Sequence, residues 1–161
     1  MSMIYNLVEA TDREIEELLA DPGKIEAFLE KEVDSIDLDK AWHGIHFLLT
    51  GSAWEGREPF CYLLKGGREI GNIDVGYGPA RALSSSEVKA FYGVLSKTST
   101  DDLAARFDRS AMMREEIYPT IWDRDREEDD TLGYLLSYYD QLREFLDKCQ
   151  SGGKGVVTCL T

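Results

Sequence analysis

Histidine, cysteine and proline are scarce in this chain of 161 residues, which contains two, three and four of them respectively. The cysteines are Cys61, Cys149 and Cys159, and they form no CxxC pair. A sparse, odd set of cysteines is typical of proteins from reducing compartments. We expect Cys149 and Cys159, which lie among apolar neighbours, to pack as small hydrophobic side chains.

Long apolar runs are also missing. No stretch approaches the roughly 18–20 apolar residues that a membrane span needs. The first nine residues have neither the basic start nor the apolar run of a signal peptide. Signatures of common catalytic loops are absent as well, because the sequence has no GxSxG and no GxxxxGK[ST]. We therefore expect a cytoplasmic protein with no membrane partner, and the sequence assigns it no reaction.

Basic side chains are in the minority. The 18 lysines and arginines face 31 acidic residues, which gives a formal net charge of −13. A surface with this much negative charge repels phosphate backbones and anionic lipids. We therefore expect no nucleic-acid partner. The charge has two remaining explanations, which are solubility and attraction to a basic protein partner, as in an immunity-type protein that masks a basic toxin.

What the sequence does contain is typical of an ordinary globular protein, with 43% hydrophobic and 30% charged residues. We find no repeat and no linker, so residues 1–161 are predicted to form a single domain. Residues 4–10 and 156–160 are apolar and predict two strands at the centre of a sheet. Capping boxes beginning at Thr11 and Ser84 predict helix starts, and helical spacing continues from Ile25 to Val33.

A long amphipathic helix is predicted from Leu132 to Cys149, followed by a stop at the Gly152-Gly153 pair. Helices must cover both faces of a sheet whose central strands are apolar. The predicted fold is therefore of the mixed α+β (α/β) class, a three-layer helix–sheet–helix body with a short mixed sheet that includes the N- and C-terminal strands.

The most informative stretch is residues 38–51. Read as a helix over residues 39–50 with Gly51 as its left-handed cap, it has an apolar face and an opposite polar stripe at 100° per residue. Trp42 and Phe47 flank this stripe, where an ordinary surface helix would carry lysine or glutamate. The stripe consists of Asp39, His43, His46 and Thr50.

Three interpretations of the stripe remain open. The histidines are buried polar groups that bond to neighbours such as Asp39 and Thr50, or they form a binding or acid–base site, since histidine titrates near neutral pH. The third interpretation, a metal site, is disfavoured because zinc needs at least three protein ligands and no later histidine exists. We expect no metal and no cofactor.

A second candidate constellation is the turn at residues 76–81, Gly-Tyr-Gly-Pro-Ala-Arg. It differs from a dinucleotide-binding loop because Arg81 occupies the position of the third glycine. Its amides and guanidinium suit a carboxylate or phosphate, although we favour a structural turn with Arg81 in an ion pair, because such turns are common. The predicted pocket joins both constellations and consists of Asp39, Trp42, His43, His46, Tyr77 and Arg81.

These motifs resemble the YfbM-like family of small bacterial proteins of unknown function. The resemblance rests on residues 38–51, residues 76–81 and the Ile-Tyr-Pro run at 117–119 with Trp122. It extends to the apolar N-terminal start and the closing strand at 155–157, and so covers essentially the whole chain. The resemblance implies a compact three-layer α/β domain and supplies no catalytic or binding residues.

The leading functional hypothesis is a domain that binds a small anionic molecule or a protein, without established catalysis. The alternative is a hydrolase or transferase in which His43 or His46 acts as the acid–base group and Arg81 holds an anion. That alternative requires Arg81 to lie near the histidines. The oligomeric state is not determined by the sequence.

Overall fold

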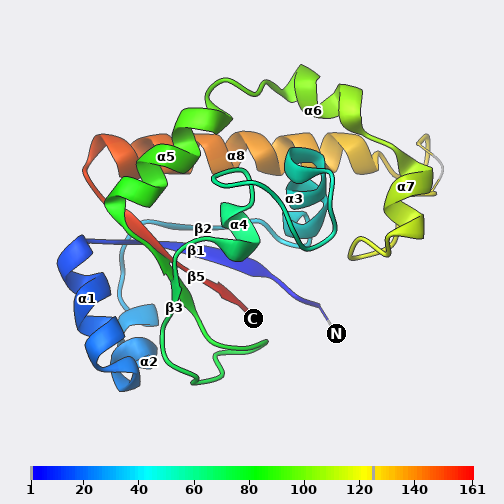
Figure 1. The fold of residues 1–161 in the computed structure, drawn as a ribbon. Helices are drawn as coiled ribbons and strands as arrows, with labels where there is room; N and C mark the ends of the chain where they lie inside the picture. The colour runs from blue at the N-terminus through cyan, green and yellow to red at the C-terminus, as the bar shows by residue number, and fades with distance from the viewer. Residues whose placement is uncertain (1, 125) are drawn as a thin grey trace.

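A five-stranded sheet forms the middle of the molecule in the computed structural model, which describes residues 2–124 and 126–161 (Figure 1). Its strand order is β2-β1-β5-β4-β3. All four pairings are antiparallel, so the expectation of a mixed sheet was wrong in strand direction: each strand runs opposite to its neighbour. The strands are β1 (Tyr5–Ala10), β2 (Ser35–Asp37), β3 (Arg68–Glu69), β4 (Arg81–Leu83) and β5 (Gly155–Leu160).

The two terminal strands pair with each other over their whole length, from Tyr5 opposite Leu160 to Ala10 opposite Gly155. Because side chains alternate between the faces of a strand, this pair supplies two separate hydrophobic cores. Leu7 belongs to the core on one face, whereas Val157 belongs to the core on the other. The apolar character of both strands, read from the sequence, therefore reflects burial on both sides.

Helices cover both faces of the sheet, as the sequence predicted (Figure 1). One face carries α1 (Asp12–Ala20), a 3₁₀ turn (Pro22–Lys24) and α2 (Ile25–Leu29). The described part of the chain places six more helices on the other face. These are α3 (Trp42–Thr50), α4 (Tyr62–Lys65), α5 (Ser85–Leu95), α6 (Thr100–Arg106), α7 (Arg109–Arg114) and α8 (Thr131–Ser151).

Helix boundaries follow the local signals in most places. Thr11 and Ser84 both form complete capping boxes, in which side chains satisfy free amides at the helix start. Gly51 ends α3 in the left-handed conformation, with φ of 76°. One predicted extension is wrong: α2 ends at Leu29, and Val33 is 40% exposed, because residues 31–34 leave the helix to enter β2.

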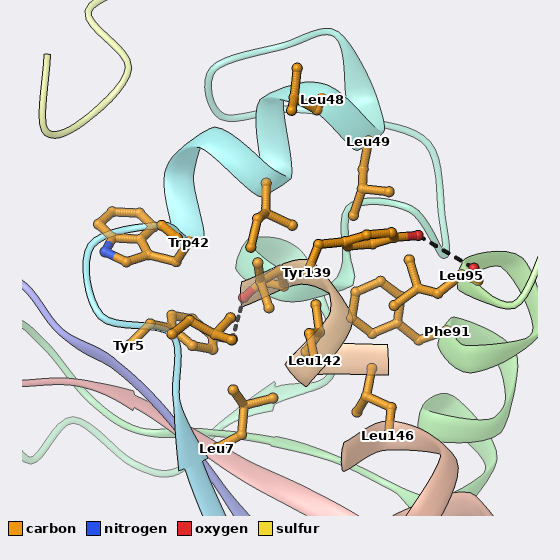
Figure 2. Close-up of a cluster of buried hydrophobic side chains, with 14 of the residues drawn as sticks. Tyr5, Leu7, Trp42, Leu48, Leu49, Phe91, Leu95, Tyr139, Leu142 and Leu146 are labelled. Carbon is orange, nitrogen blue, oxygen red and sulfur yellow. Dashed lines mark hydrogen bonds between the residues drawn. The ribbon is translucent and has the colours of Figure 1, made fainter. Parts of the chain in front are cut away.

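The larger core fixes α3 against α8 and the sheet (Figure 2). The ring of Tyr139 lies between Leu49 and Phe91. Its hydroxyl is 2.7 Å from the carbonyl of Thr98 and 3.3 Å from that of Leu95, the contact that Figure 2 marks. Gly44 allows the close approach of α3 to α8, because a Cβ there would lie 2.7 Å from Leu135 Cδ2. In residues 2–124 and 126–161, no helix has the length and apolar character that crossing a membrane requires.

Candidate functional site

His43 is a buried helix residue with both ring nitrogens engaged. It is 1% exposed. The amide of Tyr118 donates to His43 Nδ1 at 2.8 Å, so Nδ1 carries no proton. Nε2 must then bear the proton, which it donates to the carbonyl of Ala53 at 2.7 Å. Burial lowers the pKa of His43, and the ring is therefore neutral at neutral pH.

His46 is fully buried one turn further along α3. Its Nε2 donates to the carbonyl of Glu55 at 3.0 Å, while Nδ1 has no hydrogen-bond partner in the described chain. Burial lowers the pKa of His46 to about 4, and the nearby charges of Lys65 and of protonated His43 act in the same direction. The two histidines hold the loop after α3 through its backbone carbonyls, rather than bonding to Asp39 or Thr50 as expected.

Asp39 does not share a helical stripe with the histidines, whereas Trp42 lies beside them as predicted. Helix α3 begins at Trp42, and Asp39 precedes it with a positive φ of 46°, so the predicted helix start at residue 39 was wrong. The carboxylate of Asp39 accepts a hydrogen bond from Tyr134 of α8 at 2.7 Å. Trp42 is 1% exposed and stacks on the His43 ring with 5.2 Å between centroids.

Tyr77 and Arg81 do come together, at a cavity of about 280 Å³ at the β4–β5 side of the sheet. The guanidinium of Arg81 is already engaged there. It donates to the carbonyls of Gly66 at 3.0 Å and Gly67 at 3.3 Å, and it forms an ion pair with Glu69. These contacts match the structural alternative for the 76–81 turn more closely than the anion-holding one.

The six predicted residues thus fall into separate environments. Asp39 lies at the α8 contact, Trp42 with the two histidines lies in the α3 core, and Tyr77 with Arg81 lies at the sheet cavity. No hydrogen bond or ring contact among the residues described links Arg81 to either imidazole. An acid–base site would need Arg81 close to a histidine, and these contacts do not join them.

A different hollow lies at the C-terminal end of α3, and no sequence motif marks it. Its volume is about 670 Å³, which falls in the usual range for small-molecule pockets. The last turn of α3, residues 47–51, forms one wall, and the α6–α7 connection forms another. We call it the arginine groove. Its remaining lining residues are Arg57, Phe60, Arg106, Asp108 and Ala111.

The two arginines of this groove have acidic groups nearby but form no ion pair with them among the described residues: Asp108 lines the same groove, and Asp102 interacts electrostatically with Arg106. Neither Arg57 nor Arg106 forms an ion pair with a carboxylate in residues 2–124 and 126–161. The guanidinium of Arg57 lies over the ring of Phe60, 5.5 Å from its centroid. Arg106 donates one hydrogen bond, from Nη1 to the carbonyl of Leu48 at 3.2 Å. Most of their N–H groups therefore stay available to a ligand.

Acidic groups near the groove accept hydrogen bonds from backbone amides at the starts of helices. Asp108 begins α7, and its Oδ1 accepts from the amide of Ala111 at 3.1 Å. Asp102 lies one turn before Arg106, and its carboxylate accepts from the amide of Ser99 at 2.9 Å. The groove thus contains two guanidinium groups and the carboxylate of Asp108, in a chain of net charge −13. In the part of the chain that the structure describes, no group of three or more histidine, cysteine, aspartate or glutamate side chains is arranged to hold a metal ion.

The architecture defined here is an α+β domain with an antiparallel sheet between two helical layers and an arginine-lined groove at one end. The chain belongs to the family described as a domain of unknown function, DUF1877, whose model matches residues 1–159. Its fold is similar to that of YfbM from Escherichia coli, a protein of unknown function with a crystal structure. The TM-score is 0.77 at 21% identity, over 99% of this chain and 100% of that one. No curated protein matches the sequence. The YfbM-like resemblance and the predicted fold class are confirmed.

Proposed function

We propose that this protein is a binding domain that holds a small anionic molecule in the arginine groove. The observation that carries the proposal is the pair of guanidinium groups, Arg57 and Arg106, which line a sizeable hollow and form no ion pair within 4.0 Å among the described residues. A guanidinium whose donors are not held by a carboxylate is available to an external anion.

The chemistry of the groove suits binding better than proton transfer. Arginine keeps its proton at any physiological pH, and its planar donors match carboxylates and phosphates. The half-buried rings of Phe47 and Phe60 offer apolar contact for the body of such a molecule. A hydrogen bond to a charged group contributes about 1.5–3 kcal/mol, so the loss of one arginine should weaken binding about tenfold or more.

The test is a titration with simple anions, namely inorganic phosphate, benzoate and decanoate, followed by NMR of the arginine Nε–H signals and the backbone amides. We expect shifts at Arg57, at Arg106 and in residues 47–51, and weaker binding in R57Q and R106Q. Arg13→Gln is the matched control, because Arg13 lies on α1 with a side chain 90% exposed. The proposal is wrong if no anion shifts these signals, or if R57Q and R13Q weaken binding equally.

A further inference from the structure

The α6–α7 connection separates the arginine groove from a second hollow. Phe107 and Asp108 both have extended backbone angles, with φ, ψ of −65°, 120° and −137°, 99°. Successive side chains of an extended segment point to opposite sides. Arg106 and Asp108 accordingly line the arginine groove, whereas Phe107 and Arg109 line a neighbouring hollow of about 260 Å³.

This second arginine cavity repeats the charge arrangement of the first. Its lining residues are Phe107, Arg109, Arg126, Asp130 and Leu132. Like Asp108, its aspartate is committed to a helix cap, because Asp130 Oδ1 accepts from the amide of Gly133 at 2.9 Å. Each hollow therefore contains two arginines and one aspartate that is already engaged.

The distribution of ion pairs over the whole chain singles out the same four arginines. Within residues 2–124 and 126–161, each of the other arginines lies within 4.0 Å of a carboxylate; these are Arg13, Arg68, Arg81, Arg114, Arg124 and Arg143. The four arginines for which the described residues supply no such carboxylate line the two neighbouring hollows, two in each. Guanidinium groups without an ion pair to a described carboxylate thus lie on the two sides of one short connection.

We infer that the ligand is a dianion with an apolar body, which binds one anionic group in the arginine groove and the other in the second arginine cavity. This inference rests on the proposed function and specifies its ligand class. Aromatic and aliphatic side chains lie in both hollows, with Phe60 in the first and Phe107 and Leu132 in the second. A molecule with an apolar body and two anionic ends matches two neighbouring hollows that each contain a pair of arginines and apolar side chains.

The experiment compares straight-chain α,ω-dicarboxylates of increasing length with the monocarboxylate of the same length, by isothermal titration calorimetry on the full chain. At one length, the dicarboxylate should bind about tenfold or more tightly than its monocarboxylate, because a second charge-assisted contact is added. The double variant R109Q/R126Q should abolish this advantage and leave monocarboxylate affinity unchanged. R13Q should retain both affinities, and circular dichroism verifies that each variant is folded.

The outcomes distinguish the dianion inference from the proposed binding of a single anion in the arginine groove. If monocarboxylates bind through Arg57 and Arg106 but no dicarboxylate binds more tightly, the dianion inference is overturned and the proposed function stands. If R109Q/R126Q weakens both series equally, the second cavity is not a separate subsite and the inference is again overturned. If neither series binds, both the inference and the proposed function are overturned.

Discussion

Acidification should destabilise this protein through His46. The imidazole is fully buried, and this burial lowers its pKa from the ordinary 6.5 to about 4. Protonation would place an N–H on Nδ1, which has no acceptor among the described residues, and would add charge near Lys65 and His43. Since the folded state disfavours the proton, the unfolded state binds more protons between these pKa values, and stability falls as the pH falls.

The size of the effect follows from the two pKa values. Above about pH 6.5 the contribution is fully present, and between about pH 6.5 and 4 the free energy of unfolding should fall by up to about 1.4 kcal/mol per pH unit. From pH 7 to pH 5 the expected loss from His46 is about 2 kcal/mol. A loss of stability between pH 7 and 5, above the pKa of most carboxylates, would point to the buried imidazoles rather than to the acidic side chains.

The assay is urea unfolding followed by circular dichroism over this pH range, with His46→Gln as the matched variant. Glutamine does not titrate and retains an N–H donor for the carbonyl of Glu55. The pH slope should be steeper for wild type than for H46Q, because His43, whose pKa is also lowered, remains in both. Equal slopes, or an NMR titration of the His46 Hε1 signal centred near pH 6.5, would refute the reasoning.

Three substitutions test other parts of the fold by the same unfolding assay. Gly44→Ala should lower stability by about 1–3 kcal/mol, because its Cβ would lie 2.7 Å from Leu135 Cδ2; an unchanged midpoint would contradict the close packing. Tyr134→Phe should cost about 1–2 kcal/mol, since the hydroxyl donates to Asp39 and accepts from the Lys40 amide. Ser84→Ala should cost about 1 kcal/mol through the lost cap, with Ser84→Asp as the control that retains it.

Much of the fold could be predicted because its signals are local. A capping box needs only a hydroxyl and a carboxylate three residues apart, and Thr11 and Ser84 both begin helices as expected. The end of α3 at Gly51 and the two terminal strands could also be predicted from local sequence. Errors arose where the signal depends on the tertiary structure. The apolar spacing continues to Val33 although α2 ends at Leu29, so the local pattern does not show where the helix ends. The local pattern also does not show whether the strands of the sheet are mixed or antiparallel.

The groove could not be predicted for the same reason. Arg57 lies in the loop after α3, but Arg106 comes from a distant segment, and the lining residues form no local motif. What marks the two arginines is that neither forms an ion pair with a described carboxylate, and a sequence with 31 acidic residues gives no indication of which arginines remain unpaired. Whether an arginine has a carboxylate partner depends on the tertiary structure, which brings distant side chains together.

The histidines nonetheless bear on the groove, although not as reacting groups. His43 and His46 donate to the carbonyls of Ala53 and Glu55, and so fix the loop that leads directly to Arg57. The same helix ends at the groove wall. Because both imidazoles are held neutral by burial, this attachment persists at neutral pH. His43 and His46 therefore help to position Arg57, which no sequence motif singles out. They act through hydrogen bonds to backbone carbonyls, and such bonds cannot be read from the residue types.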